Sequence, residues 1–343
     1  MFVRENRDIT IYDVAKALGL SPSTVSRALK NHPHISSATK KKILACASEM
    51  GYRHNKFASN LRQKRTNTIG VVVPKLKSYF MASVLSGIEK ETSRNGYGLI
   101  ITQSQESWEK EIVCINTLFN SSVDGLLVSL ASDTENANHF KSFFNRGIPI
   151  VFFDRVMDCN GCVNVVIDNY KAGYELTSHL ISRGCRRIMH LGGNMLRNVY
   201  YERFRGYRQA LIDNNIEFDN RMLVVGDMSN KSGIDLVNSI LKMKHRPDGI
   251  FTSNDTTGVT IILELQKAGI RVPDEIAVAG FNNEPVSQYV TPNLTTVDYP
   301  AREMGELAMK MLLNKLNDPQ DQNLNTVILN HKLIIRQSSL KES

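Results

Sequence analysis

The sequence lacks any long hydrophobic run. No stretch approaches the roughly 18 apolar residues that a membrane-spanning helix needs, and the first ten residues, MFVRENRDIT, contain no apolar signal region. These absences argue against membrane association and predict a cytoplasmic protein.

Cysteine is scarce, with five residues in a chain of 343. Only Cys159 and Cys162, in the segment DCNGC, lie close together in the sequence. Metal sites built on cysteine normally use a second pair or nearby histidines, and neither accompanies this pair. We therefore expect no bound metal, and two free thiols in a surface loop.

The motifs of common enzymes are also missing. The sequence contains no GxGxxG, no P-loop ending in GKS or GKT, and no GxSxG nucleophile motif. His190, in the apolar segment HLGG, is expected to be a buried core residue rather than a catalyst. No nucleophile with a base in reach is evident, so the sequence favours neither an enzyme nor a bound cofactor.

The excess of positive charge is confined to the N-terminal fifth of the chain. Residues 1–66 contain 13 Lys and Arg against 4 Asp and Glu, or +9, whereas the remaining 29 basic and 30 acidic residues give −1. A basic head on a neutral body predicts that only the head binds a polyanion such as DNA. The alternative is an ordinary solvated charged face.

Within the head, the segment from Thr10 to Leu29 predicts two short helices joined by a tight turn. Thr10 and Ser21 are N-cap residue types at the start of apolar helical repeats, and Gly19 lies where the chain must reverse. This pattern is typical of a helix-turn-helix, and a helical hairpin of no special function is the alternative. The apolar residues expected to pack together are Ile11, Val14, Ala15, Leu18, Val25, Ala28 and Leu29.

The outer face of the second helix carries Ser23, Thr24, Ser26 and Arg27. In a helix-turn-helix this helix enters the major groove, where hydroxyls bind base edges or phosphates and arginine binds guanine through two hydrogen bonds. Arg27 is therefore the main base-reading candidate.

A third helix is expected to start at Ser36 or Ser37 and to stop at Gly51. Residues 54–67 begin with Phe57, Ala58 and Leu61 at helical spacing and continue as a basic stretch without an apolar period, which predicts a hinge helix and linker. The packing side of the third helix is expected to hold Ile43, Leu44 and Ala47.

Beyond the hinge, strand-like apolar runs alternate with amphipathic helical segments, which predicts parallel sheets. Ten such runs over roughly 275 residues are too many for one core, so we expect two doubly wound subdomains with ligand chemistry at the carboxyl ends of the strands. The runs are TIGVVVP, YGLIITQ, VDGLLVSL, PIVFFD, VNVVID, RIMHLGG, MLVVGD, GIFTSN, IAVAGF and LTTV.

These features resemble the lactose/galactose repressor (LacI/GalR) family of bacterial transcription regulators. The resemblance implies a three-helix head over residues 1–53, a hinge over 54–67 that becomes helical on DNA, and a body over 68–343 similar to type I periplasmic binding proteins. It runs through the segments TIYDVAKALGLSPSTVSRAL, ASNL, TIGVVVP, GIEKE, VDGLLVS, RFRGY, SNDTTG, RVPDEIAVAGFNN and PNLTTV. The two flavodoxin-like subdomains would comprise about 68–166 plus 297–325, and about 167–296 plus 326–343.

By resemblance, Leu61 matches the hinge leucine that family members insert into the minor groove of the operator. The family commonly has proline at His54 and arginine at Ser59, and Lys56 and Arg62 are expected to compensate. The DNA-binding residues implied are Thr10, Ser21, Pro22, Ser23, Thr24, Ser26, Arg27, Asn31, Lys56, Leu61 and Arg62.

The resemblance also implies an effector cleft between the subdomains. Relatives often carry aspartate where Asn282 stands, which weakens the expectation of a sugar. Lys75 and Lys77 are expected to face water, and the alternative is that they add positive potential near the cleft. The effector-binding residues implied are Phe80, Met81, Asp154, Arg197, Arg203, Met228, Asn254 and Asn282.

The sequence thus predicts a homodimeric repressor that binds a pseudo-palindromic DNA operator and is switched by a small-molecule effector, a sugar or sugar derivative. A small-molecule-binding protein without a regulatory role is the alternative, and the basic head argues against it. An enzyme built on the α/β body is a third class, for which no catalytic residues are found.

Overall fold

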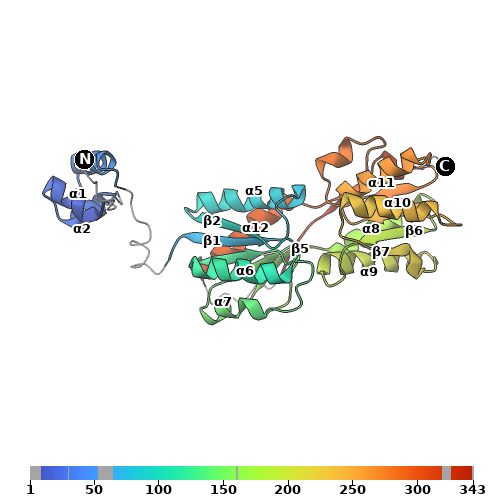
Figure 1. Cartoon of the computed structure of the whole chain (residues 1–343), viewed down its shortest axis with the longest axis horizontal. Helices are drawn as coiled ribbons and strands as arrows, with labels where there is room; N and C mark the ends of the chain where they lie inside the picture. Colours follow the sequence, from blue (N-terminus) through green and yellow to red (C-terminus); the bar gives the residue numbers. More distant parts are fainter. Residues whose placement is uncertain (1–8, 30, 53–64, 160, 319–325, 342–343) are drawn as a thin grey trace, which may run out of the picture. The chain divides into compact units, whose positions relative to one another are not determined.

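The computed structural model describes residues 9–29, 31–52, 65–159, 161–318 and 326–341. The chain forms two units, Met1–Thr66 and Asn67–Ser343, which we call the head and the body (Figure 1). In the described parts of both units, no helix is long and apolar enough to cross a membrane.

The head contains the two expected helices of the helix-turn-helix, α1 (Ile11–Leu18) and α2 (Pro22–Leu29). The Asp13 carboxylate accepts the Thr10 backbone N–H at 2.8 Å, and the Ser21 hydroxyl accepts the Thr24 N–H at 3.2 Å, so both helices start where their cap residues predicted. Gly19 ends α1 with a φ of 63°, a left-handed conformation that glycine adopts without strain.

A third helix, α3 (Ser37–Glu49), begins after Ser36, whose hydroxyl accepts the Thr39 N–H at 3.2 Å. Leu44 was expected on its packing side, but its side chain is 53% exposed. Each residue turns a helix by about 100°, and Ile43 faces inward, so the next side chain points away from the core. The buried core of the head is Val14, Ala15, Val25, Ala28, Ile43 and Ala47.

The first subdomain of the body is a parallel six-stranded sheet in the order β11-β5-β4-β3-β1-β2. Five of its strands follow the flavodoxin-like order β2-β1-β3-β4-β5, and β11 is added at the edge beside β5. The strands are β1 (Thr68–Val73), β2 (Gly98–Gln103), β3 (Gly125–Val128), β4 (Ile150–Phe153), β5 (Val163–Ile167) and β11 (Thr326–Leu329).

Helices cover both faces of this sheet (Figure 1). Alternate residues of β1 separate the two sides: Val71 packs in the cluster formed with α5 and α12, and Val72 packs in the cluster formed with α6 and α7. Helices α5 and α12 approach closely, because a Cβ on Gly305 would lie 2.0 Å from the Val84 carbonyl oxygen. The helices are α5 (Tyr79–Arg94), α6 (Trp108–Asn120), α7 (Lys141–Asn145) and α12 (Ala301–Asn317).

The second subdomain repeats this plan with a sheet in the order β7-β6-β8-β9, which β10 adjoins through a bridge between Ala279 and Thr295. The strands are β6 (Ile188–Gly192), β7 (Leu223–Val225), β8 (Gly249–Thr252), β9 (Ala277–Ala279) and β10 (Thr296–Asp298). The helices are α8 (Asn169–Ser182), α9 (Asn198–Asp213), α10 (Asn230–Leu241) and α11 (Asp255–Lys267).

The described part of the body also contains short 3-10 helices. They are η1 (Asn138–Phe140), η2 (Asn220–Met222), η3 (Pro285–Gln288) and η4 (Gln337–Ser339).

All ten expected strands are present, and β11 and β12 (Lys332–Ile334) were not foreseen. Residues 326–343 were assigned to the second subdomain, but β11 pairs with β5 of the first. The chain crosses to the second subdomain only afterwards, where β12 pairs antiparallel with β10. The boundary therefore lies after Leu329.

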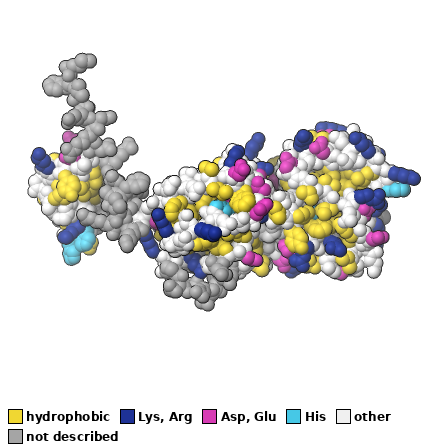
Figure 2. Space-filling view, turned by 60° about the horizontal axis from the view of Figure 1, so that its bottom comes forward, with side chains coloured by type: hydrophobic (Ala, Val, Ile, Leu, Met, Phe, Trp, Pro, Cys, Tyr) yellow, Lys and Arg dark blue, Asp and Glu magenta, His cyan; other side chains and the backbone are white. Residues whose placement is uncertain are grey.

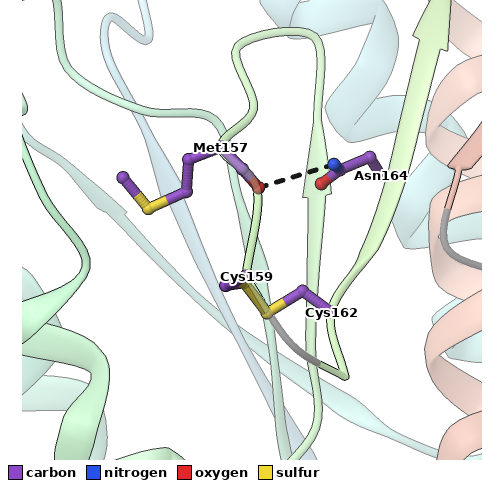
Figure 3. The surroundings of a disulfide bond; sticks show 4 residues. All are labelled: Met157, Cys159, Cys162 and Asn164. Carbon is purple, nitrogen blue, oxygen red and sulfur yellow. Dashed lines mark hydrogen bonds between the residues drawn. A yellow bond between two sulfur atoms is a disulfide. The ribbon is translucent and has the colours of Figure 1, made fainter.

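The loop between β4 and β5 also differs from expectation. Cys159 and Cys162 form a disulfide and are not two free thiols (Figure 3). Gly161, with a φ of 80°, turns the chain so that the two Cα atoms lie 5.6 Å apart, within the range that a disulfide spans. The loop is closed further by Asn164, which donates to the Met157 carbonyl at 3.4 Å.

Candidate DNA-binding surface and effector cavity

The predicted recognition helix, α2, buries one face and exposes another. Val25 and Ala28 are buried, whereas Ser21, Ser23 and Arg27 are exposed. The hydroxyls form a local chain in which Ser21 Oγ lies 2.8 Å from both Ser23 Oγ and Thr24 Oγ1. Pro22, Thr24 and Ser26 are half-buried.

Other features of the head lie around this surface. Asn31 is exposed just after α2, and its side chain accepts a hydrogen bond from Lys40 of α3 at 2.8 Å. Thr10 donates its hydroxyl to Asp13 at 2.6 Å. Tyr12 of α1, which was not singled out from the sequence, is 65% exposed. Figure 2 shows basic and histidine side chains on the head beside a hydrophobic patch.

The predicted hinge contacts cannot be placed in the same way. Lys56, Leu61 and Arg62, together with His54 and Ser59, lie outside the described residues.

The body contains a cavity of about 670 Å³ where the carboxyl ends of the strands of the two subdomains meet. This is the position at which parallel α/β sheets bind ligands. Seven of the eight predicted effector residues line it: Phe80, Met81, Asp154, Arg203, Met228, Asn254 and Asn282.

Arg197 is the exception. It immediately precedes α9, is only 5% exposed, and donates to the backbone carbonyl of Thr134 in the first subdomain. This hydrogen bond joins the subdomains, and Arg197 is not among the residues that line the cavity.

Arg203 is held rigidly at the cavity. Its Nε donates to Asn169 Oδ1 at 2.8 Å and its Nη1 donates to the Ser253 carbonyl at 3.1 Å. The guanidinium stacks 3.6 Å from the centroid of the Phe281 ring. Burial lowers the pKa of Arg203.

Asp154 lies beside this arginine and is also buried. Its Oδ1 accepts the Tyr299 hydroxyl at 3.0 Å, and the Tyr299 ring lies 4.6 Å from that of Phe80. Burial raises the pKa of Asp154, and a φ of 59° places it in the left-handed region. Met228 also has a φ of 59°, and its backbone carbonyl accepts a hydrogen bond from the side-chain amide of Asn254 at 2.8 Å.

An ion pair of the first subdomain is connected by hydrogen bonds to the second subdomain. Arg155 donates to Glu106 Oε2 at 2.6 Å and to the Tyr200 hydroxyl of α9 at 3.1 Å. Burial opposes ionisation of Glu106, but Arg155 beside it outweighs this and keeps the pKa of that carboxyl below its usual range. Asn198 of α9 adds two bonds, accepting from the Val156 N–H and donating to the Asp154 carbonyl, each at 3.0 Å.

Several lining residues were not predicted to bind a ligand. Glu106, Arg155 and Glu284 each follow a strand, which is the signal that could have found them. Glu284 accepts the Thr256 hydroxyl at 2.8 Å, and burial raises its pKa. Lys75 and Lys77 are exposed to water, as expected, and both also line the cavity.

Two other candidates considered from the sequence were a metal site and a catalytic histidine. In the described part of the chain, no group of three His, Cys, Asp or Glu side chains could hold a metal ion. His190 is fully buried, as expected, and its Nδ1 lies 3.2 Å from the Phe251 carbonyl.

A helix-turn-helix head joined to a two-subdomain body with a cavity between the strand ends defines a class of protein, the DNA-binding regulators with a periplasmic-binding-protein-like body. Residues 10–55 match the family described as bacterial regulatory proteins, lacI family, and residues 177–339 match the periplasmic binding protein-like domain. The chain belongs to the LacI family.

Its relatives span the whole chain. It is 30% identical to catabolite control protein A of Priestia megaterium over 333 residues, covering 97% of this chain and 99% of that protein. It is 31% identical to the transcriptional repressor PurR of Vibrio atlanticus (strain LGP32), covering 97% and 98%. The second relative is named as a helix-turn-helix transcriptional repressor.

Solved structures agree on the fold. The lac repressor dimer bound to operator and the anti-inducer ONPF has a TM-score of 0.86 at 23% identity, covering 97% of this chain and 100% of that one. The CelR–cellobiose complex has a TM-score of 0.71 at 26% identity, covering 96% and 99%.

Proposed function

We propose that the protein is a homodimeric transcriptional repressor whose affinity for a pseudo-palindromic operator is switched by a small molecule bound in the body cavity. One observation carries the proposal. A single chain of the LacI family has an exposed face of hydroxyls and arginine on α2, and it also has a polar cavity between two subdomains. Base contacts from α2 would specify the site and basic residues would position the head.

The network at the cavity supports a switch. Arg155 with Tyr200, and Val156 with Asn198, join the subdomains at one side of the cavity. A ligand that contacts both subdomains would favour one arrangement over another, and by linkage would change the affinity for DNA.

Binding of the full chain to the DNA upstream of its own gene tests the proposal. We expect tight binding to one short site and much weaker binding to scrambled DNA of the same composition. Equal affinity for both DNAs would refute a sequence-specific regulator.

Leu61→Ala tests the hinge assignment in the same assay. We expect operator affinity to fall far more than non-specific affinity, because only a kinked site uses the leucine wedge. Equal losses on both DNAs would exclude that role.

A further inference from the structure

The acidic and basic side chains that line the cavity differ in whether they already have partners within the protein. Four carboxylates line it, from Glu106, Asp154, Asp227 and Glu284, and all have protein donors. Asp227, for example, accepts the Ser232 hydroxyl at 2.5 Å. The acidic side chains are therefore already committed within the fold.

The basic side chains differ. Five line the cavity, and Arg155, Arg203 and Lys75 contact protein acceptors or a carboxylate. Lys77 and Lys231 remain, and in the described residues no carboxylate lies within ion-pair distance of either ammonium group. Lys77 comes from the first subdomain and Lys231 from the second, and both are exposed at the cavity.

Both lysines lie at the N-terminus of a helix. Lys77 directly precedes Ser78, the N-cap of α5, and Lys231 lies in the first turn of α10 after its N-cap, Ser229. The N-terminus of a helix carries partial positive charge, so a cation there is unfavourable unless an anion accompanies it. Ser78 and Ser229 themselves line the cavity, so both helix ends open onto it.

A buried polar atom points to a ligand independently. Ser253 lines the cavity and is 2% exposed, yet its Oγ has no hydrogen-bond partner among the described residues. A buried hydroxyl without a partner is costly, and a polar atom of a bound molecule would satisfy it.

We infer that the effector carries a phosphate group, bound between Lys77 and Lys231, and a polar atom that reaches Ser253 deeper in the cavity. This inference rests on the proposed function, since it names the chemistry of the effector. Because the lysines belong to different subdomains, a phosphate between them would hold the cavity closed.

Inorganic phosphate is the simplest probe. Thermal unfolding of the full chain is compared in phosphate and in chloride at equal ionic strength, for the wild type, Lys77→Met/Lys231→Met, and Lys242→Met as a control at the other end of α10. General salting-out by phosphate raises the melting temperature of all three equally. We expect a further rise of about 2–4 °C in the wild type and the control only.

Equal shifts in the wild type and the double variant would overturn the inference. A second arm compares a hexose with its 6-phosphate, and we expect the phosphate ester to stabilise the wild type more, with the double variant losing that difference. A larger effect from the neutral sugar would also overturn it. Operator binding is measured on the same samples, so a wild type that binds operator but shows no phosphate-specific rise refutes only this inference.

Discussion

Arg27 is exposed on the face of α2 opposite Val25 and Ala28. Replacing it by alanine is expected to cost about 1–3 kcal/mol of operator binding and to relax specificity at one base pair, because a bidentate contact to guanine would be lost. Competition binding with single-base operator variants measures this. Arg183→Ala, on the body, is the control, and an equal loss there would contradict a base-reading role.

His190 predicts a pH dependence of stability. Burial lowers its pKa to about 3. Below pH 6.5 the unfolded chain binds a proton on this residue that the folded chain does not, so the free energy of unfolding falls as the pH falls toward 3, by up to about 1.4 kcal/mol per pH unit. His190→Gln should reduce that slope between pH 6 and 4.5, as judged by urea unfolding.

His179 should behave in the same direction, since burial lowers its pKa to about 4. The exposed His245→Gln serves as the control for both. An unchanged slope in His190→Gln would mean that the residue titrates alike in the folded and unfolded chains.

The residues predicted best from sequence are those fixed by local chemistry. Caps such as Ser21 and the turn at Gly19 depend only on neighbours in the chain. Leu44 was placed wrongly because the rotation of a helix against its core depends on tertiary packing. The contact of Arg197 across the subdomain boundary was not foreseen for the same reason.

At the scale of elements, α5 and α12 pack through glycine. Gly305→Ala would place a Cβ 2.0 Å from a backbone oxygen of α5, which the backbone must move to avoid. We expect a loss of about 1–3 kcal/mol in the free energy of unfolding, despite the higher helix propensity of alanine. Gly98→Ala is the matched control, because its nearest neighbour atom lies 3.8 Å away. A neutral or stabilising Gly305→Ala would show that the helices separate easily.

The β4–β5 loop gives a second test at this scale. Alkylation of the unfolded chain without reductant should modify Cys46, Cys114 and Cys185 only, and reduction should add Cys159 and Cys162. Mass spectrometry counts the modified residues. Five modified cysteines before reduction would mean that the pair does not form a disulfide in the purified protein.

The ten strands were predictable because most of them are largely apolar runs, which favour strands of a parallel sheet. β11, an edge strand in which only Leu329 is buried, was not predicted. The disulfide escaped because the spacing of two cysteines does not determine the turn at Gly161 that brings them together.

For the whole molecule, the concentration of charge in the head predicts a steep salt dependence. With 6–10 phosphate contacts, operator affinity should fall by a factor on the order of 10³–10⁵ between 50 and 200 mM salt. Fluorescence anisotropy across a salt series measures the slope. Body variants such as Lys242→Met should leave the slope unchanged, and a flat salt response would exclude phosphate contacts as the main source of affinity.

The last described segment of the chain belongs to both halves of the body. β11 closes the edge of the first sheet, β12 pairs with β10, and Ser338 Oγ donates to the Val278 carbonyl of the second subdomain at 2.6 Å. Neither half is therefore a continuous stretch of sequence. A chain cut at residue 325 would leave two sheets incomplete at once, so such a truncation should abolish regulation as fully as a much earlier one.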